Sequence, residues 1–267
     1  MMQKILKYTG LCFLVIVLYQ ILQVFFLSLP SSGTFAFQDD SVFRTCLVDV
    51  VMIAVCLCLL HTVLSNVRLG ILKPARFSVL PWFGLMLIAL LLGQCAATAI
   101  YLANGDSAYD NYVTVLSDTE NLFYVLLAVF LAPMCEELYC RGVIYRSLRE
   151  LMPVLPAAVL SSLFFALIHG TVLHLIPTFL LAMVSALAFE ATNRIWVSIL
   201  LHAGNNLIVL WIGGATFPDF LFQPLFLILG IGGFCGVLVV LCLTVKRRTV
   251  EDLVVDIIEE TVKKEDA

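Results

Sequence analysis

The sequence predicts an all-α membrane protein, a polytopic bundle of about eight transmembrane helices. Hydrophobic residues make up 62% of the 267 residues and charged residues only 13%, whereas a typical soluble domain is about 45–50% apolar and about 25% charged. The apolar runs are continuous and about 20 residues long, the length of a helix that crosses a hydrocarbon core of about 30 Å. Helices satisfy their backbone hydrogen bonds internally, so such runs predict helices and not barrel strands.

Eight apolar segments are the predicted spans, with these approximate bounds: residues 5–29, 43–66, 79–103, 120–141, 156–173, 175–192, 195–213 and 220–245. Lys4 and Lys7 precede the apolar stretch of the first segment, as in a signal peptide. Its apolar stretch is too long for the core of a signal peptide, so we interpret it as a retained anchor. Residues 1–245 therefore form one polytopic membrane domain.

Residues 246–267 differ in character and predict a cytoplasmic amphipathic tail. Thr249 and Asp252 have the spacing of a helix cap. The apolar residues that follow share one helical face; they are Val250, Leu253, Val254, Ile257, Ile258 and Val262.

The basic residues predict the orientation. If there are eight spans, Arg44 alone among the 15 lysines and arginines falls on the side opposite the others. Loops rich in lysine and arginine stay in the cytoplasm, so both termini should be cytoplasmic. The loop over residues 106–118 contains acidic and no basic residues and should be external. We expect an integral, multi-pass protein of the plasma membrane.

Composition also excludes several classes of function. The net charge is −4 and the chain has no basic stripe, so nucleic acid is not an expected partner. Nine cysteines are scattered without a CxxC pair, which argues against a structural zinc site and a disulfide framework. The expected partners are the lipid bilayer and a membrane-associated substrate.

Two adjacent glutamates, Glu136 and Glu137, lie in the predicted fourth span. Charges in a bilayer are costly by a few kcal/mol and usually mark function or a buried pair. Glu137 has the spacing of a helical ion pair with Arg141, so it is either that partner or a functional residue. Glu136 lies about 100° around the helix and is not explained by the pair. We expect Arg141 at the cytoplasmic interface, with the helix continuing into the cytosol up to Glu150.

Two later helices bring polar residues to the depth of Glu136. A turn with two prolines follows residue 151, so the fourth and fifth helices form a tight hairpin that places His169 level with Glu136. His202 lies about eight residues beyond Arg194, at a similar depth. Asn206 is one turn further on the same face, whereas Asn205 points elsewhere. The sequence thus predicts an intramembrane site near the cytoplasmic side.

The chemistry of this set favours hydrolysis of an amide by activated water. A carboxylate in an apolar, partly dry site is a better base for water near neutral pH. Imidazole and carboxamide N–H groups can donate to the oxyanion of a tetrahedral intermediate. The chain has no GxSxG, nucleotide-loop or HExxH motif.

Two other classes of function remain open at this point. Intramembrane carboxylates and histidines also form the relays of proton-coupled transporters, although the chain lacks the paired broken helices and two-half symmetry of many transporters. A catalytically silent membrane scaffold with the same fold is the other alternative. It would be indicated by loss of a site residue, and none is lost.

Three motifs together resemble the CPBP family of intramembrane endopeptidases, the CAAX protease and bacteriocin-processing family, also called Abi. They cover a catalytic core of about residues 119–213 and read Glu136-Glu137-x-x-x-Arg141, Phe165-x-x-x-His169 and His202-x-x-x-Asn206. Each motif alone is weak, but their order on successive membrane segments is specific.

The resemblance implies a role for each residue of the motifs. Glu136 would activate water with help from His169, His202 and Asn206 would stabilise the oxyanion, and Arg141 would order the site by pairing with Glu137. Members have also been described as metalloproteases, and Glu136, His169 and His202 are a possible zinc set with an open position for water. We favour catalysis without a metal or other cofactor. Family substrates range from prenylated CAAX proteins to bacteriocin and signal-peptide precursors, with some members acting in immunity, so the motifs do not identify the substrate.

Overall fold

The computed structural model describes most of the chain: residues 2–29, 40–64, 84, 86–88, 90, 122–169, 172–213 and 224–265. Within these ranges every regular element is a helix, which confirms the all-α class. Five helices of the described part are long and apolar enough to cross a membrane, and two shorter apolar helices accompany them. The chain is therefore a multi-pass membrane protein with a polytopic helical bundle.

In chain order the bundle begins with α1 (Met2–Ser28) and α2 (Asp40–Thr62) and continues, after a composite helix over residues 122–149, with α8 (Val154–Ile168), α9 (Val172–Thr192), α10 (Ile195–Gly213) and α11 (Pro224–Glu265). The composite helix consists of α5 (Leu122–Leu126), η2 (Leu127–Leu131), α6 (Ala132–Glu137), η3 (Leu138–Tyr145) and α7 (Arg146–Arg149), of which η2 and η3 are π-helical.

Helices lie at seven of the predicted spans, with bounds that agree to within a few residues at most ends, and five of these helices are long and apolar enough to cross a membrane. The predicted third span, 79–103, falls largely outside the described residues, although residues 84, 86–88 and 90 are helical. The predicted external loop over 106–118 also lies outside them.

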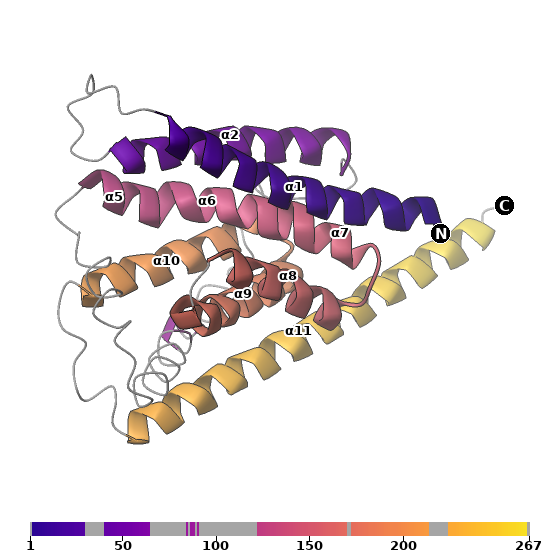
Figure 1. Cartoon of the computed structure of the whole chain (residues 1–267). Coiled ribbons are helices and arrows are strands. Elements are labelled where there is room, and N and C mark those ends of the chain that lie inside the picture. Colours follow the sequence, from indigo (N-terminus) through magenta and orange to yellow (C-terminus); the bar gives the residue numbers. More distant parts are fainter. Residues whose placement is uncertain are drawn as a thin grey trace.

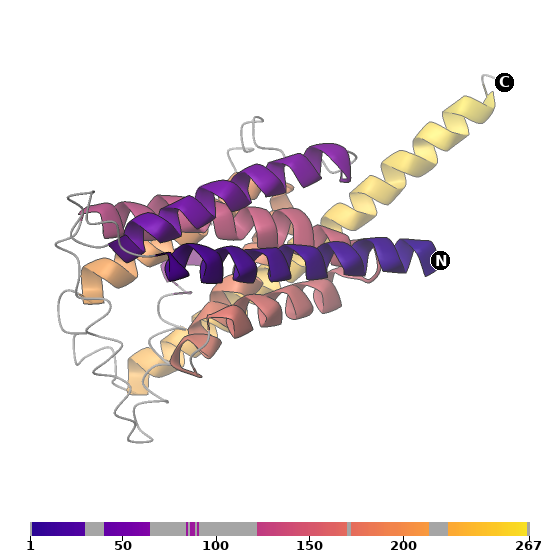
Figure 2. The ribbon, with the colours of Figure 1, turned by 45° about the horizontal axis from the view of Figure 1, so that its top comes forward.

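The composite helix occupies the centre of the bundle. It contacts α1 and α2 on one side and α8, α9 and α10 on the other, as Figures 1 and 2 show. Every residue of η3 is buried. The turns after Arg141 pack inside the bundle, where η3 is enclosed by α1, α2, α8 and α9; their position in the cytosol stays a prediction.

A proline accounts for the first π-helical segment. Pro133 occupies the first turn of α6, directly after η2. It has no N–H to donate to the carbonyl of Val129, and its ring clashes with that carbonyl in a regular α-helix. A wider π turn over Leu127–Leu131 relieves the clash and leaves carbonyl groups of η2 available to other helices.

Small residues allow α9 to pack deeply in the bundle. Residues 181–189 of α9 are all buried and include Ala182, Ser185, Ala186 and Ala188. Such residues let helix backbones approach closely in membranes, and the hydroxyl of Ser198 in α10 donates to the carbonyl of Ser185 at 2.9 Å. This contact fixes α10 against α9 and so positions the polar residues of α10.

The last helix, α11, runs without a break through the predicted boundary at residues 245 and 246. It packs on α9, and its C-terminal end extends past the bundle in both ribbon views (Figures 1 and 2). The N-terminal end of α1 lies at the same end of the molecule (Figure 1). The assignment of that end to the cytoplasm remains a prediction from the basic residues.

Candidate active site

Glu137 and Arg141 form an ion pair inside the bundle. Arg141 Nη1 lies 3.0 Å from Glu137 Oε1, and the two side chains are 1% and 0% exposed. Arg141 Nη2 donates to the carbonyl of Ala182 in α9 at 2.9 Å, and the guanidinium stacks 5.1 Å from the ring of Phe165. The sequence predicted the pair. It also placed Arg141 at the membrane interface, and that depth stays a prediction; the structure adds that the guanidinium is enclosed by α8 and α9.

Glu137 has a second partner that the spacing in the sequence did not predict. His202 Nδ1 lies 3.0 Å from Glu137 Oε1, the same oxygen that faces Arg141. An ionised carboxylate accepts hydrogen bonds only, so His202 Nδ1 carries the proton and donates it. Glu137 thereby links α6 to α10 and fixes the orientation of the His202 ring.

The ring of His169 is oriented in a similar way. His169 caps the C-terminal end of α8, and its Nδ1 lies 2.7 Å from the carbonyl oxygen of Phe165. A carbonyl oxygen can only accept, so Nδ1 is the donor. Both histidines therefore direct Nε2 away from their bonded nitrogen and toward Glu136.

Glu136 lies between the two Nε2 atoms. Its Oε2 is 3.9 Å from His169 Nε2 and 3.7 Å from His202 Nε2, and its side chain is 15% exposed. These distances are too long for direct hydrogen bonds, and a polar contact of this length is often bridged by water. Glu136, His169 and His202 come together as the sequence predicted, from α6, the end of α8, and α10.

Asn206 lies further along α10 and contacts the first π-helical segment. Its Nδ2 donates to the carbonyl of Ala128 in η2 at 2.9 Å. A carboxamide has two N–H groups, so one remains for another acceptor. Asn205 does not point away from this region as we expected; it is buried and its Nδ2 approaches Asn206 Oδ1 at 3.4 Å. The π turn thus fixes the side chain of Asn206, one helical turn beyond His202.

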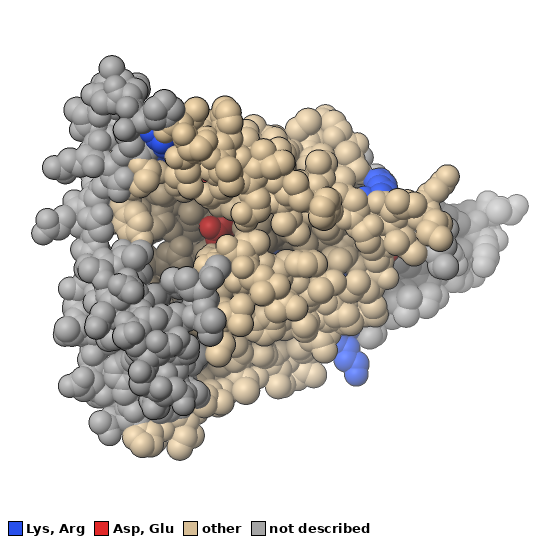
Figure 3. Space-filling model, viewed as in Figure 1, with Lys and Arg blue, Asp and Glu red and all other residues tan. Residues whose placement is uncertain are grey.

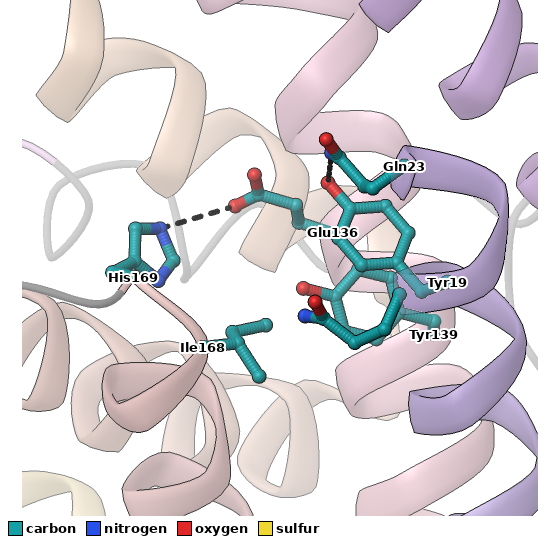
Figure 4. A pocket seen from close by; sticks show the side chains of 7 residues that line it. Tyr19, Gln23, Glu136, Tyr139, Ile168 and His169 are labelled. Atoms are coloured by element: carbon teal, nitrogen blue, oxygen red, sulfur yellow. Dashed lines mark hydrogen bonds and ion pairs between the residues drawn. The ribbon is translucent and has the colours of Figure 1, made fainter. Parts of the chain in front are cut away.

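A cavity of about 230 Å³ opens beside Glu136. The face shown in Figure 3 is almost free of charge in its described part, and an acidic side chain is visible in a recess of that face. Figure 4 shows Glu136 between His169 on one side and a group of tyrosine and glutamine side chains on the other. The residues that line the cavity with Glu136 are Tyr19, Gln20, Gln23, Tyr139, Ile168 and His169.

Sequence reasoning missed the part of this cavity that α1 contributes. Gln20 and Gln23 are polar residues in an otherwise apolar span, and this signal could have identified them. Tyr139 gave no comparable signal, because a tyrosine in a membrane helix is ordinary. Its ring packs on Tyr19 with the centroids 5.2 Å apart.

The donor set fits zinc in its chemistry. Zinc binds carboxylate oxygen and imidazole nitrogen, and ligating histidines usually donate their other N–H to a carbonyl or carboxylate, as His169 and His202 do. The spacing is wide for the ion, since ligands at about 2.0–2.1 Å around a tetrahedral zinc lie about 3.3 Å apart. Within the described residues no group of three such side chains is arranged to hold a metal.

The fold and the site define a class of protein, a multi-pass membrane protein in which polar residues converge beside a cavity. Residues 118–208 match the family model described as Type II CAAX prenyl endopeptidase Rce1-like. That segment contains all six predicted site residues, and the match confirms the resemblance to the CPBP family.

A curated relative is the protein named "Putative membrane peptidase YdiL" from Bacillus subtilis (strain 168). It is 28% identical over 85 residues, which are 32% of this chain and 35% of the relative. The alignment thus spans about a third of the relative's length. No solved structure matches the chain.

Proposed function

We propose that the protein is an intramembrane endopeptidase that hydrolyses a peptide bond with water activated by Glu136. The observation that carries this proposal is the approach of His169 Nε2 and His202 Nε2 to within 3.9 and 3.7 Å of one carboxylate oxygen beside a cavity. The family match supports a membrane protease of CAAX type in general. A transporter would need a polar path on both sides of this cluster, and no observation favours one.

The base in this mechanism is Glu136. A water held between Glu136 Oε2 and an imidazole Nε2 donates one proton to the carboxylate as its oxygen attacks the carbonyl carbon of the substrate. His169 suits the second contact, because its Nδ1 proton is bound by the Phe165 carbonyl and its Nε2 accepts. The proton on Glu136 then passes to the leaving nitrogen, and the carbon–nitrogen bond breaks.

The oxyanion of the tetrahedral intermediate needs donors. His202 donates at Nε2 only when the ring carries two protons, because its Nδ1 proton is bound to Glu137. The Glu137 carboxylate holds the ring of His202 in place through Nδ1, and the second N–H of Asn206 provides a further donor. In this reading Glu137 and Arg141 position His202 and do not touch the substrate.

Zinc bound by Glu136, His169 and His202 is the alternative, and it would act as a Lewis acid on bound water. We favour the reaction without metal, because the spacing of the three side chains is wider than zinc would impose. Elemental analysis of an active preparation distinguishes the two. We expect less than stoichiometric zinc and activity that survives a strong chelator. One zinc per chain, with activity lost on chelation and restored by zinc, contradicts this expectation.

The substrate belongs to the class of membrane-associated peptides or protein precursors. Processing of prenylated CAAX proteins, of bacteriocin or signal peptides, and a role in immunity are all compatible with the family. The site residues themselves do not select among these.

The test of the proposed function is cleavage of a peptide library. Wild-type protein and Glu136→Gln, both reconstituted in lipid nanodiscs, are incubated with the library, and products are identified by mass spectrometry. We expect defined products with the wild type and their loss with the variant. Equal cleavage by both proteins would exclude Glu136 as the base, and absence of cleavage by either would contradict a peptidase.

A further inference from the structure

The cavity has a second side that the proposed mechanism does not use. We call it the polar wall, and it consists of Tyr19, Gln20 and Gln23 from α1 with Tyr139 from η3. Figure 4 shows Tyr19, Gln23 and Tyr139 across from His169, with Glu136 between them. Helix α1 lies outside the segment that matches the family model, so that match does not cover the three residues that α1 contributes to the wall.

The hydroxyl of Tyr139 is an unused hydrogen-bonding group in the wall. The side chain is 2% exposed, and its oxygen has no hydrogen bond of ordinary geometry within the described residues. The Cys140 thiol beside it is only a weak partner. A buried hydroxyl without a partner is energetically unfavourable, so its presence beside the cavity indicates a ligand that supplies one.

The two glutamines extend the same polar surface along α1. Gln23 Nε2 donates to the hydroxyl of Tyr19 at 2.9 Å, which leaves the Gln23 carbonyl, its second N–H and the Tyr19 proton for a ligand. Gln20 is exposed and also lines the cavity. Three residues of one helix therefore present both donors and acceptors.

The composition of the wall limits what it can bind. The wall contains no charged side chain, and among the described residues that line the cavity Ile168 is the single aliphatic one, so neither an ionic headgroup nor a prenyl chain fits the wall well. The cavity that the wall lines has a volume of about 230 Å³, which is below the usual range of about 300–1,000 Å³ for pockets that enclose a small molecule. A short neutral segment with alternating donors and acceptors fits best, which describes a peptide backbone.

The membrane provides the reason for such a site. A helical peptide must unwind before water can reach its carbonyl carbon, and each freed N–H or C=O costs several kcal/mol in an apolar environment unless it finds a partner. A carboxamide offers the same donor and acceptor as a peptide group. The polar wall can therefore bind the unwound residues while Glu136 faces the bond to be broken.

We propose that the polar wall is the substrate subsite and binds the main chain of an unwound peptide next to the scissile bond. This rests on the proposed function for the identity of the substrate. Recognition is through the backbone, so it selects segments that unwind easily and tolerates different side chains.

The test uses two synthetic probes and the full chain in lipid nanodiscs. Each probe is an apolar 20-residue peptide with a central photo-leucine. The first has a Gly-Gly pair beside the photo-leucine, and the second has Ala-Ala there, because glycine favours unwinding by roughly 1 kcal/mol per residue relative to alanine. Cross-linking is measured with Glu136→Gln protein, so hydrolysis does not consume the probe, and the attachment site is mapped by mass spectrometry.

We expect the Gly-Gly probe to cross-link more than the Ala-Ala probe, with attachment near residues 19–23. Tyr139→Phe and Gln20→Leu/Gln23→Leu should each lower its apparent affinity by roughly 2- to 13-fold for every hydrogen bond lost. Tyr8→Phe is the matched control, since Tyr8 lies on α1 near Lys4 and Lys7 and does not line the cavity. With Glu136 intact, the wall variants should raise KM and leave kcat nearly unchanged.

Each outcome decides between the two proposals. Equal cross-linking of both probes, no cross-linking, or affinities unchanged in the wall variants would overturn the subsite, even if peptides are cleaved. Cross-linking that depends on the wall, without cleavage by the wild-type protein, would support the subsite and contradict the peptidase.

Discussion

The two sides of α6 carry adjacent glutamates in opposite environments. On the Glu137 side, the carboxylate is fully buried and one oxygen faces both Arg141 and His202 at 3.0 Å. On the Glu136 side, the carboxylate faces a cavity, and the two nearest histidine nitrogens stand 3.7 and 3.9 Å away. Spacing in the sequence ties Glu137 to a partner, whereas Glu136 has room for a ligand. We call the Glu137 side of α6 the closed side, because its contacts hold the site together. We call the Glu136 side the open side, because it faces the cavity where chemistry can occur.

The largest expected effect comes from the open side. Glu136→Gln keeps the side-chain shape but removes the base, so we expect hydrolysis to fall by about 10²–10⁴-fold. Within the described part of the chain no direct hydrogen bond of ordinary length is lost, and the midpoint of thermal unfolding should stay near that of the wild type. Peptide cleavage and a melting curve, measured on the same preparation, check both parts. A large loss of stability would place Glu136 with the structural residues.

Asn206 lies one helical turn beyond His202 in α10, and its replacement is the next largest expected effect. One N–H is bound to the Ala128 carbonyl, and the other is the proposed oxyanion donor. Loss of such a donor typically lowers kcat by about 10²–10³-fold, and we expect this of Asn206→Ala with little change in KM.

Asn205→Ala is the matched control for Asn206→Ala. Among the described residues, the hydrogen bond that it removes is a long contact of 3.4 Å, so kcat should change by much less. Equal losses in the two variants would indicate that this part of α10 acts through packing alone.

Much of this arrangement was predictable, and the failures share a physical cause. Helix spacing predicted the pair of Glu137 and Arg141, and the short hairpin after the composite helix placed His169 level with Glu136. These inferences use distances along one helix or across one turn. The bond from Glu137 to His202 and the burial of Arg141 depend on how α8, α9 and α10 rotate against α6, which spacing along one helix does not determine.

The packing of α1 against the site was missed for a related reason. Its contact with η3 joins segments more than a hundred residues apart, and no motif marks α1. The π turn at Ala128 was also missed, although Pro133 was visible in the sequence, because a proline in a membrane helix can be accommodated by a kink as well as by a π turn.

On the closed side the expected effect is on stability. Glu137→Gln leaves the guanidinium of Arg141 buried without its counter-ion, and breaking one half of a buried pair typically costs about 3–5 kcal/mol. The sequence alone suggested that Arg141 could reach the headgroups, but at 1% exposure it has no such route. We expect a less stable protein with reduced but measurable activity, because the ring of His202 also loses its acceptor.

A second substitution sharpens this expectation. Glu137→Gln/Arg141→Gln removes both members of the pair and should recover part of the lost stability, whereas Glu136→Gln/Arg141→Gln should recover none. Unfolding in a detergent series measures the coupling. If the first double variant is no more stable than Glu137→Gln alone, the ion pair is not the role of Glu137, and a direct part in catalysis becomes the better interpretation.

The smallest expected effect concerns a third buried acid, Asp49 of α2. It takes no part in the proposed mechanism or in the ion pair of Glu137 with Arg141. Asp49 is 1% exposed, and neither carboxyl oxygen makes a hydrogen bond of ordinary geometry within the described residues. The Cys135 thiol beside it is a weak donor. Asp49→Asn therefore removes no strong contact and relieves the burial of an acidic group. We expect activity within about threefold of the wild type and a free energy of unfolding that is unchanged or higher by at most about 1 kcal/mol.

Buried acids in membranes are more often functional than not, so a loss of cleavage comparable with that of Glu136→Gln would overturn this view. It would extend the open side of α6 through Cys135 to α2 and make Asp49 part of the route by which Glu136 exchanges its proton.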